Sequence, residues 1–167
     1  ARSGVMAMVE VYADERVLMA HEGPLFVCGW CDAPTSVQMQ AMAEHGRRCE
    51  SREQPLALVN VVFGGVPRFP EEVRVSAAAL TRDATLFARS RAHVVMLPGF
   101  AGAAVMAFIN TFMLLGRPPR PTRVFRALEP AALWTARAST PELSPASIHA
   151  TVEQVRVRLA GRPRVTP

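Results

Sequence analysis

The pattern of apolar and polar positions switches along the chain between a strand-like and a helix-like period. Short apolar runs with the length and residue types of strands are bounded by glycine, proline or acidic residues that indicate turns. These expected strands are residues 9–13, 16–21, 25–30, 56–62, 92–97 and 122–127, of which 25–30 either stands alone or continues the strand before it. The run 56–62 is almost continuously apolar, which is typical of a central strand covered on both faces.

Helices are expected between and after these strands. They are predicted at residues 35–49, 70–87, 100–115 and 129–137, with a further helix beginning at Ser144-Pro145. Thr35 and Gln38 have the spacing of a capping box, and the second helix carries an apolar stripe at helical intervals from Val73 to Phe87. Strands that alternate with helices predict an α/β layer with parallel pairings, entered through an antiparallel hairpin.

Length and composition favour one globular domain. Half of the 167 residues are hydrophobic and a fifth are charged, which is ordinary for a globular protein rather than a disordered chain. All 19 basic residues are arginine, which we interpret first as a coding bias, and the net charge is +5. Arginines gather at 117–126 and 156–164, but no aromatic residues interleave in the tail, so a nucleic-acid partner is not expected. An acidic protein partner is compatible with this charge.

Residues 94–115 carry no charge and are long enough to suggest a transmembrane helix. Pro98-Gly99 divides this stretch, however, and Arg91 and Arg117 flank its two ends without giving an orientation signal. A buried strand, a turn and a buried helix fit this pattern better. The N-terminus turns acidic too early for a secretory signal, so we expect a cytoplasmic protein without a transmembrane segment.

The last part of the alternating pattern has the packing positions of a final strand and helix. These positions are Val124, Phe125, Ala132 and Trp134. Together with the order and lengths of the preceding elements, they resemble the bacterial STAS-like proteins (sulphate-transporter and anti-sigma-factor-antagonist domains) over residues 9–137. The resemblance implies an α/β fold with a mixed β-sheet of about five strands and helices mainly on one face. It also implies a small regulatory or scaffolding module that acts by protein–protein interaction.

Many STAS-like proteins are switched by phosphorylation of a serine or threonine just after the central strand, and this chain departs from that pattern. Residues 63–69 read FGGVPRF, without a hydroxyl group, and Asn60 stands where an acidic residue would be expected. The usual phosphoswitch is therefore not expected, whereas docking through the same loop is. Partner-binding residues are predicted at the carboxyl ends of strands, where α/β sheets place their sites, as Phe63, Gly64, Gly65, Val66, Arg68, Pro98, Gly99 and Phe100.

The cysteines raise the question of a metal site. Cys28 and Cys31, with His45 and Cys49, have a spacing close to that of small zinc fingers. If 25–30 is a strand and the next helix runs back along it, His45 and Cys49 lie about 15 to 20 Å from Cys31, too far to share an ion. The zinc site is therefore an alternative to this fold. A redox pair is disfavoured because Cys28 precedes the helix start by several residues. Strand-borne cysteines without a metal or cofactor are the preferred interpretation.

The helix expected at 100–115 is apolar on two faces, and both must be buried. One face covers the sheet, and the residues of the second face are Met106, Ile109 and Met113. The tail helix carries an apolar stripe at Ile148, Val152, Val155 and Leu159. We predict that this stripe docks on the second face, within one chain or across a homodimer. The alternative is that the second face packs on neighbouring helices and the tail binds elsewhere.

No catalytic constellation stands out in the sequence. The histidines are dispersed, and His93 lies in an expected buried strand, where a hydrogen-bonded core histidine is the usual finding. The sequence therefore predicts a non-enzymatic, STAS-like interaction module at 1–138, followed at 139–167 by an extension with one amphipathic helix and a flexible basic end. The alternatives are a small-ligand or lipid-head-group binding domain that uses the same loops, or a zinc-stabilised form of the module.

Overall fold

The strands form a single mixed sheet whose spatial order follows the sequence. The computed structural model describes residues 7–51, 54–139 and 143–163. The strands are β1 (Val9–Ala13), β2 (Val17–Glu22), β3 (Leu25–Trp30), β4 (Ala57–Val62), β5 (Ser90–Val95) and β6 (Thr122–Phe125). β1, β2 and β3 pair antiparallel, and β3 to β6 pair in parallel. The predicted mixed α/β sheet is confirmed, with six strands in the described part of the chain where about five were expected.

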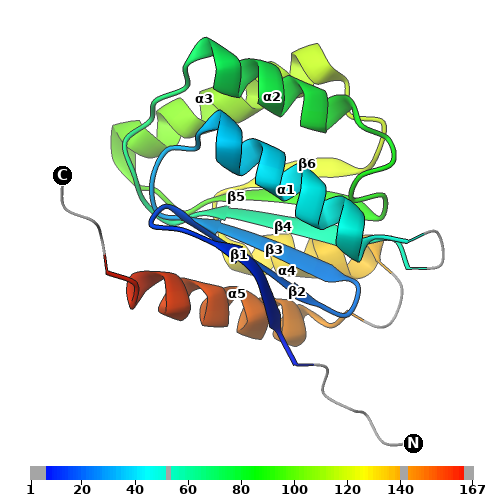
Figure 1. Cartoon of the computed structure of the whole chain (residues 1–167). Coiled ribbons are helices and arrows are strands. Elements are labelled where there is room, and N and C mark those ends of the chain that lie inside the picture. Colours follow the sequence, from blue (N-terminus) through cyan, green and yellow to red (C-terminus); the bar gives the residue numbers. More distant parts are fainter. Residues whose placement is uncertain (1–6, 52–53, 140–142, 164–167) are drawn as a thin grey trace, which may run out of the picture.

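The helices lie in two layers, one on each face of the sheet (Figure 1). They are α1 (Ser36–Cys49), α2 (Glu71–Arg82), α3 (Gly99–Gly116), α4 (Leu128–Ala138) and α5 (Pro145–Ala160). α1, α2 and α3 each connect a parallel strand to its next neighbour, always stepping in the same direction across the sheet. Because such crossovers share one hand, they place all three helices on the same face. α4 and α5 follow the edge strand β6 and cover the other face.

Local side-chain chemistry explains where the first elements begin. In the turn between β1 and β2, Asp14 Oδ1 accepts hydrogen bonds from the backbone N–H groups of Arg16 and Val17, at 2.8 and 3.0 Å. α1 begins with the predicted capping box, in which Thr35 and Gln38 each satisfy the other's backbone N–H. The hairpin and the helix start are therefore both confirmed.

The second helix ends earlier than predicted. α2 stops at Arg82, and Asp83 then accepts hydrogen bonds from the backbone and hydroxyl group of Thr85. Phe87, which fitted the helical stripe, lies outside the helix in a left-handed conformation with φ of 49°. Its ring is still buried, packed against Phe26 with ring centroids 5.2 Å apart. The apolar periodicity therefore marked a core position correctly while misplacing the end of the helix.

The tail helix packs on the opposite face from the one predicted. Its stripe residues Ile148, Val152 and Val155 are fully buried against the inner side chains of the sheet and α4, and Leu159 is 6% exposed. Met106, Ile109 and Met113 belong to the cluster beneath α1, α2 and α3 on the other side of the sheet. The prediction that the tail docks on that face within one chain is therefore wrong. The stripe is already covered by the sheet and α4, so the tail binds elsewhere, as in the alternative prediction.

Gly29 on β3 explains how closely the tail helix approaches the sheet. A Cβ atom at this position would lie 2.6 Å from Cγ1 of Val155 and 2.9 Å from the ring of Phe63. Only glycine leaves room for both side chains. α5 therefore packs on β3 at the point where the strand has no side chain on that face.

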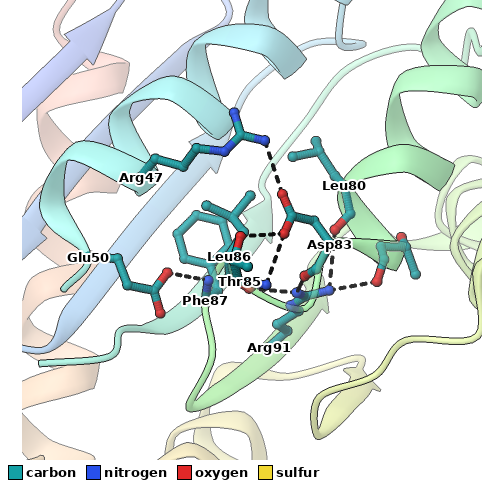
Figure 2. A network of polar contacts seen from close by, with 9 residues as sticks. Arg47, Glu50, Leu80, Asp83, Thr85, Leu86, Phe87 and Arg91 are labelled. Atoms are coloured by element: carbon teal, nitrogen blue, oxygen red, sulfur yellow. Dashed lines mark hydrogen bonds and ion pairs between the residues drawn. The ribbon is translucent and has the colours of Figure 1, made fainter. Parts of the chain in front are cut away.

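A dense set of buried polar contacts joins the end of α2 to the start of β5 (Figure 2). The guanidinium of Arg91 donates to backbone carbonyls of Leu80, Thr81, Asp83 and Leu86, and the residue is 3% exposed. Nearby, the Glu50 carboxylate accepts from the backbone N–H groups of Leu56, Phe87 and Ala88. We call Arg91, Glu50, Asp83 and these backbone partners the Arg91 network. It holds the loop between α2 and β5 against the end of α1.

One helix in the described part of the chain, α3, is long and apolar enough to cross a membrane by length and composition alone. Within the chain, 28% of it is buried, and apolar core helices meet the same criterion. Its outward side chains include Phe100, Leu114 and Leu115, which are 87%, 79% and 67% exposed. α3 therefore covers the sheet with one side and presents an apolar surface on the other.

Candidate binding pocket

An apolar cavity of about 90 Å³ lies between the sheet and the layer formed by α1, α2 and α3. Its floor is formed by β3, β4 and β5, and its walls come from all three helices. The loops that follow β3 and β4 complete the lining with residues 32–34 and 64–67. Gly65 and Val66 in the second loop are exposed, so the cavity opens towards the carboxyl ends of the parallel strands. α/β sheets commonly bind ligands at this edge.

Three polar side chains form a hydrogen-bonded row on the cavity floor. The indole N–H of Trp30 donates to Oδ1 of Asn60 at 2.7 Å, and Nδ2 of Asn60 lies 3.1 Å from Nδ1 of His93. The parallel register sets Asn60 directly beside His93 on the neighbouring strand. Trp30, at the end of β3, reaches across to the same amide. We call the cavity with these three residues the His93 pocket.

His93 is held in its neutral form. Burial, together with the nearby positive charge of Arg91, lowers the pKa of His93 from its ordinary 6.5 to about 4. At neutral pH the imidazole therefore carries one proton, and its two ring nitrogens have different roles. The accessible part of the side chain faces the cavity that it lines.

Close contact between two loops shapes the rim of the pocket. Gly65 has a φ of 112°, a conformation that side chains disfavour. A Cβ atom there would lie 2.5 Å from Cα of Asp32, in the loop after β3. The glycine therefore allows the loops after β3 and β4 to touch backbone to backbone beside the mouth.

Aromatic rings stiffen one wall of the pocket. Phe69 stacks on Phe108 of α3 with ring centroids 3.7 Å apart, and Phe108 meets Phe112 edge to face at 4.7 Å. Phe112 in turn lies edge-on to His93, with centroids 6.5 Å apart. Such pairs hold large side chains in fixed positions at little conformational cost. The wall runs from the loop after β4 down to the floor.

The predicted partner-binding residues are divided by this geometry. Gly64, Gly65 and Val66 line the His93 pocket. Phe63 turns towards the other face, where it lines a wider groove of about 660 Å³ together with residues of α5, and Gly64, Gly65 and Val66 border this groove as well. The remaining predicted residues are exposed around the rim and the start of α3 without lining the cavity, namely Arg68, Pro98, Gly99 and Phe100. The loop after β4 lies at the carboxyl end of its strand, as predicted, and its binding role stays a prediction.

The four residues of the zinc alternative do not converge. Among the described residues, no three His, Cys, Asp or Glu side chains form a group that could hold a metal ion. Cys28 packs in the core beneath α1, whereas Cys31 packs against the cluster on the other face, so the two thiols point apart. Burial, with the nearby charge of Asp14, raises the pKa of the Cys28 thiol well above its ordinary value. His45 instead packs beside the Tyr12 ring, with centroids 5.8 Å apart.

Sequence reasoning missed the residues on the pocket floor. His93 was expected as a hydrogen-bonded core histidine, which its contact with Asn60 bears out, but its place in a cavity was not foreseen. A signal was present, because Asn60 and His93 are isolated polar residues within apolar runs that become neighbouring parallel strands. Polar side chains at such positions need a partner or a ligand.

When compared with family models, with curated proteins and with solved structures, the chain matches none. The functional interpretation therefore depends on the geometry of the pocket and of the surfaces around it.

Proposed function

We propose that the chain is a non-catalytic binding module that takes a small apolar molecule into the His93 pocket. In this proposal it is a cytoplasmic, STAS-like regulatory module whose contacts with a protein partner depend on that ligand. The observation that carries the proposal is a preformed apolar cavity with a few convergent polar groups at the carboxyl edge of the parallel strands. Pockets of this composition are the usual sites of small-molecule binding.

The polar groups of the pocket support binding rather than catalysis. The hydroxyl groups in the lining belong to Thr81 and Thr122, and both donate to backbone carbonyls, of Ala77 and Arg120. Neither hydroxyl is hydrogen-bonded to His93, as an activated nucleophile would be to its base. The ring nitrogen of His93 that could accept a proton is already engaged by Asn60.

Filling the pocket from one wall tests this proposal. Ala77 of α2 lines the cavity and is 2% exposed, so Ala77→Leu adds bulk directly to the binding space. Ala79→Leu, on the exposed side of the same helix, is the matched control. We expect a panel of small cyclic hydrocarbons and ketones to bind the wild type and the control in ligand-observed NMR, with binding at least about tenfold weaker in Ala77→Leu. Binding that is equal in all three proteins, or absent from the wild type, would contradict the proposal.

A second candidate function, protein–protein contact, is favoured by the outer side of α3. Phe100, Leu114 and Leu115 are among the most exposed large apolar side chains in the described part of the chain. Apolar surface of this kind marks interaction sites on many proteins. We propose that a second copy of the chain covers it. Analytical ultracentrifugation tests this, since Leu114→Glu should shift a dimer to a monomer, whereas Val157→Glu, at an exposed position on α5, should not.

A further inference from the structure

The contacts of Asn60 fix the direction of its side-chain amide. The indole N–H of Trp30 can only donate a hydrogen bond, so the atom that faces it must be the amide oxygen of Asn60. The amide nitrogen, which can only donate, therefore faces Nδ1 of His93. Nδ1 must accept this hydrogen bond and carries no proton. A neutral imidazole in this arrangement carries its proton on Nε2.

The Nε2–H group is consequently an unused donor on the pocket floor. No hydrogen bond to it is found among the described residues, and the Phe112 ring, with its centroid 6.5 Å from that of His93, is too distant to accept one. The surrounding walls are mainly apolar side chains of α1, α2 and α3. The donor faces the open space of the cavity, and an acceptor atom on an otherwise apolar ligand that enters the cavity would satisfy it.

We infer that the ligand of the His93 pocket is a compact, neutral, apolar molecule that presents one carbonyl-type oxygen to Nε2–H of His93. This inference rests on the proposed binding function and adds the chemistry by which the ligand is recognised. The row from Trp30 through Asn60 acts as a positioning device, because it sets which nitrogen of His93 carries the proton. The aromatic wall of Phe69, Phe108 and Phe112 contacts the apolar body of the ligand.

Charge and size narrow the class of ligand further. A carboxylate is disfavoured because Asp32 lies at the mouth and because an anion would lose its hydration in an apolar cavity. A cation is disfavoured because the positively charged Arg91 lines the cavity, and because the Nε2–H of His93 is a donor, which does not bind a cation. The volume of about 90 Å³ is smaller than the engineered cavity of about 150 Å³ that holds benzene. A ring of about five atoms is therefore the appropriate scale.

The tautomer of His93 can be measured directly in the wild-type protein. Long-range ¹H–¹⁵N NMR distinguishes a protonated ring nitrogen from an unprotonated one. We expect His93 to carry its proton on Nε2 at neutral pH, and we expect cyclopentanone to shift that resonance while cyclopentane does not. A proton on Nδ1, a doubly protonated ring, or identical responses to both compounds would overturn the inference. This measurement needs no variant and so does not depend on a mutant that folds.

A matched pair of ligands then isolates the contribution of the donor. Cyclopentane and cyclopentanone differ in one carbonyl oxygen, and His93→Phe replaces the imidazole with a ring that has no N–H group. In His93→Phe, we expect the dissociation constant of cyclopentanone to rise by about tenfold over that of the wild type, while the dissociation constant of cyclopentane changes by less than about twofold. An unchanged ratio of the two dissociation constants would overturn the inference.

The outcomes separate this inference from the function on which it rests. If the wild type binds cyclopentane but not cyclopentanone, the pocket is a binding site and the inferred acceptor is wrong. If the wild type binds neither compound, the proposed function fails together with the inference. Preferential binding of cyclopentanone that depends on His93 supports both.

Discussion

Arg91 and His93 lie two residues apart on β5 and point to the same face of the sheet, but their surroundings differ sharply. Arg91 donates to carbonyl groups of four residues at the end of α2 and in the following loop (Figure 2). His93 has one polar partner, Asn60, and its other nitrogen faces the cavity. On the same strand, most hydrogen-bond donors of Arg91 therefore have partners, whereas only one of the two ring nitrogens of His93 has one.

We propose that this difference separates a structural role for Arg91 from a binding role for His93. A buried polar network with its partners in place rigidifies the fold, and the Arg91 network joins α1, α2 and β5 in this way. The second ring nitrogen of His93 has no hydrogen-bond partner among the described residues and faces the cavity, where in our proposal a ligand satisfies it. We therefore expect substitutions near Arg91 to act mainly on folding and substitutions near His93 to act mainly on ligand recognition.

The largest effect should come from breaking the Arg91 network. Arg91→Met keeps much of the apolar stem but removes the donors from the buried carbonyl groups of Leu80, Thr81, Asp83 and Leu86. We expect the free energy of unfolding to fall by about 3 to 5 kcal/mol in urea titrations. Arg123→Met, at an exposed position on β6, is the control and should change it by less than about 0.5 kcal/mol. A loss below about 1 kcal/mol for Arg91→Met would remove the distinction between the two regions.

An intermediate effect is expected from the pH dependence of His93. In the unfolded chain this histidine gains a proton as the pH falls below its ordinary pKa of 6.5, whereas in the folded chain its pKa is about 4. Stability should therefore be complete above pH 6.5 and fall by about 3 kcal/mol as the pH drops to about 4. Urea titrations at about pH 7 and about pH 4.5 test this, since His93→Gln should lose most of the change and His149→Gln, at an exposed position, should keep it.

Two carboxylates act in a separate pH window. Burial of Asp14 is outweighed by hydrogen bonds from Gln38 and from the backbone of Arg16, so its pKa lies below its ordinary value of 3.8. The pKa of Asp83 is likewise lowered, since hydrogen bonds from Thr85 and Arg47 outweigh burial. Their stabilising contribution is present above pH 3.8 and is lost below it. A fall in stability between pH 6.5 and pH 4 that is lost in His93→Gln therefore reports on His93 rather than on these two carboxylates.

The smallest effect on stability should come from Trp30→Phe. This change keeps an aromatic ring in the pocket but leaves Oδ1 of Asn60 without its donor, at a cost of about 1 kcal/mol. The amide of Asn60 is then free to turn, so the proton of His93 should distribute over both ring nitrogens in ¹⁵N NMR. Trp134→Phe, on the other face of the sheet, should leave the tautomer unchanged. A single Nε2–H tautomer in Trp30→Phe would show that Asn60 is held by something else.

The order of strands and helices could be predicted because it depends on local patterns. The continuous apolar run at β4, the capping box of α1 and the hairpin before β2 each belong to one short segment. The end of α2 could not be predicted in this way. There the apolar repeat continues to Phe87, while the contacts that stop the helix come from Arg91 and from Asp83 in the following loop.

The positions of the tail helix and the pocket could not be read from the sequence for a different reason. The stripe on α5 shows that a face must be buried, but the sheet and α3 both offered apolar surface to cover it. Likewise, the row of Trp30, Asn60 and His93 exists only after three strands have paired in one register. The resemblance to STAS-like proteins stays a prediction that the ligand and dimer experiments can refine.

Gly29 lies in a strand whose two faces contact different layers of helices. Its neighbours in β3, Cys28 and Trp30, face the layer that contains the pocket, while the space above its own Cα is occupied by Val155 and Phe63. Phe63 also begins the loop that forms the pocket rim. A methyl group at position 29 would lie 2.6 Å from Val155 and 2.9 Å from Phe63, so both side chains would have to move, and the loop at the pocket rim would be disturbed from the reverse side of the sheet.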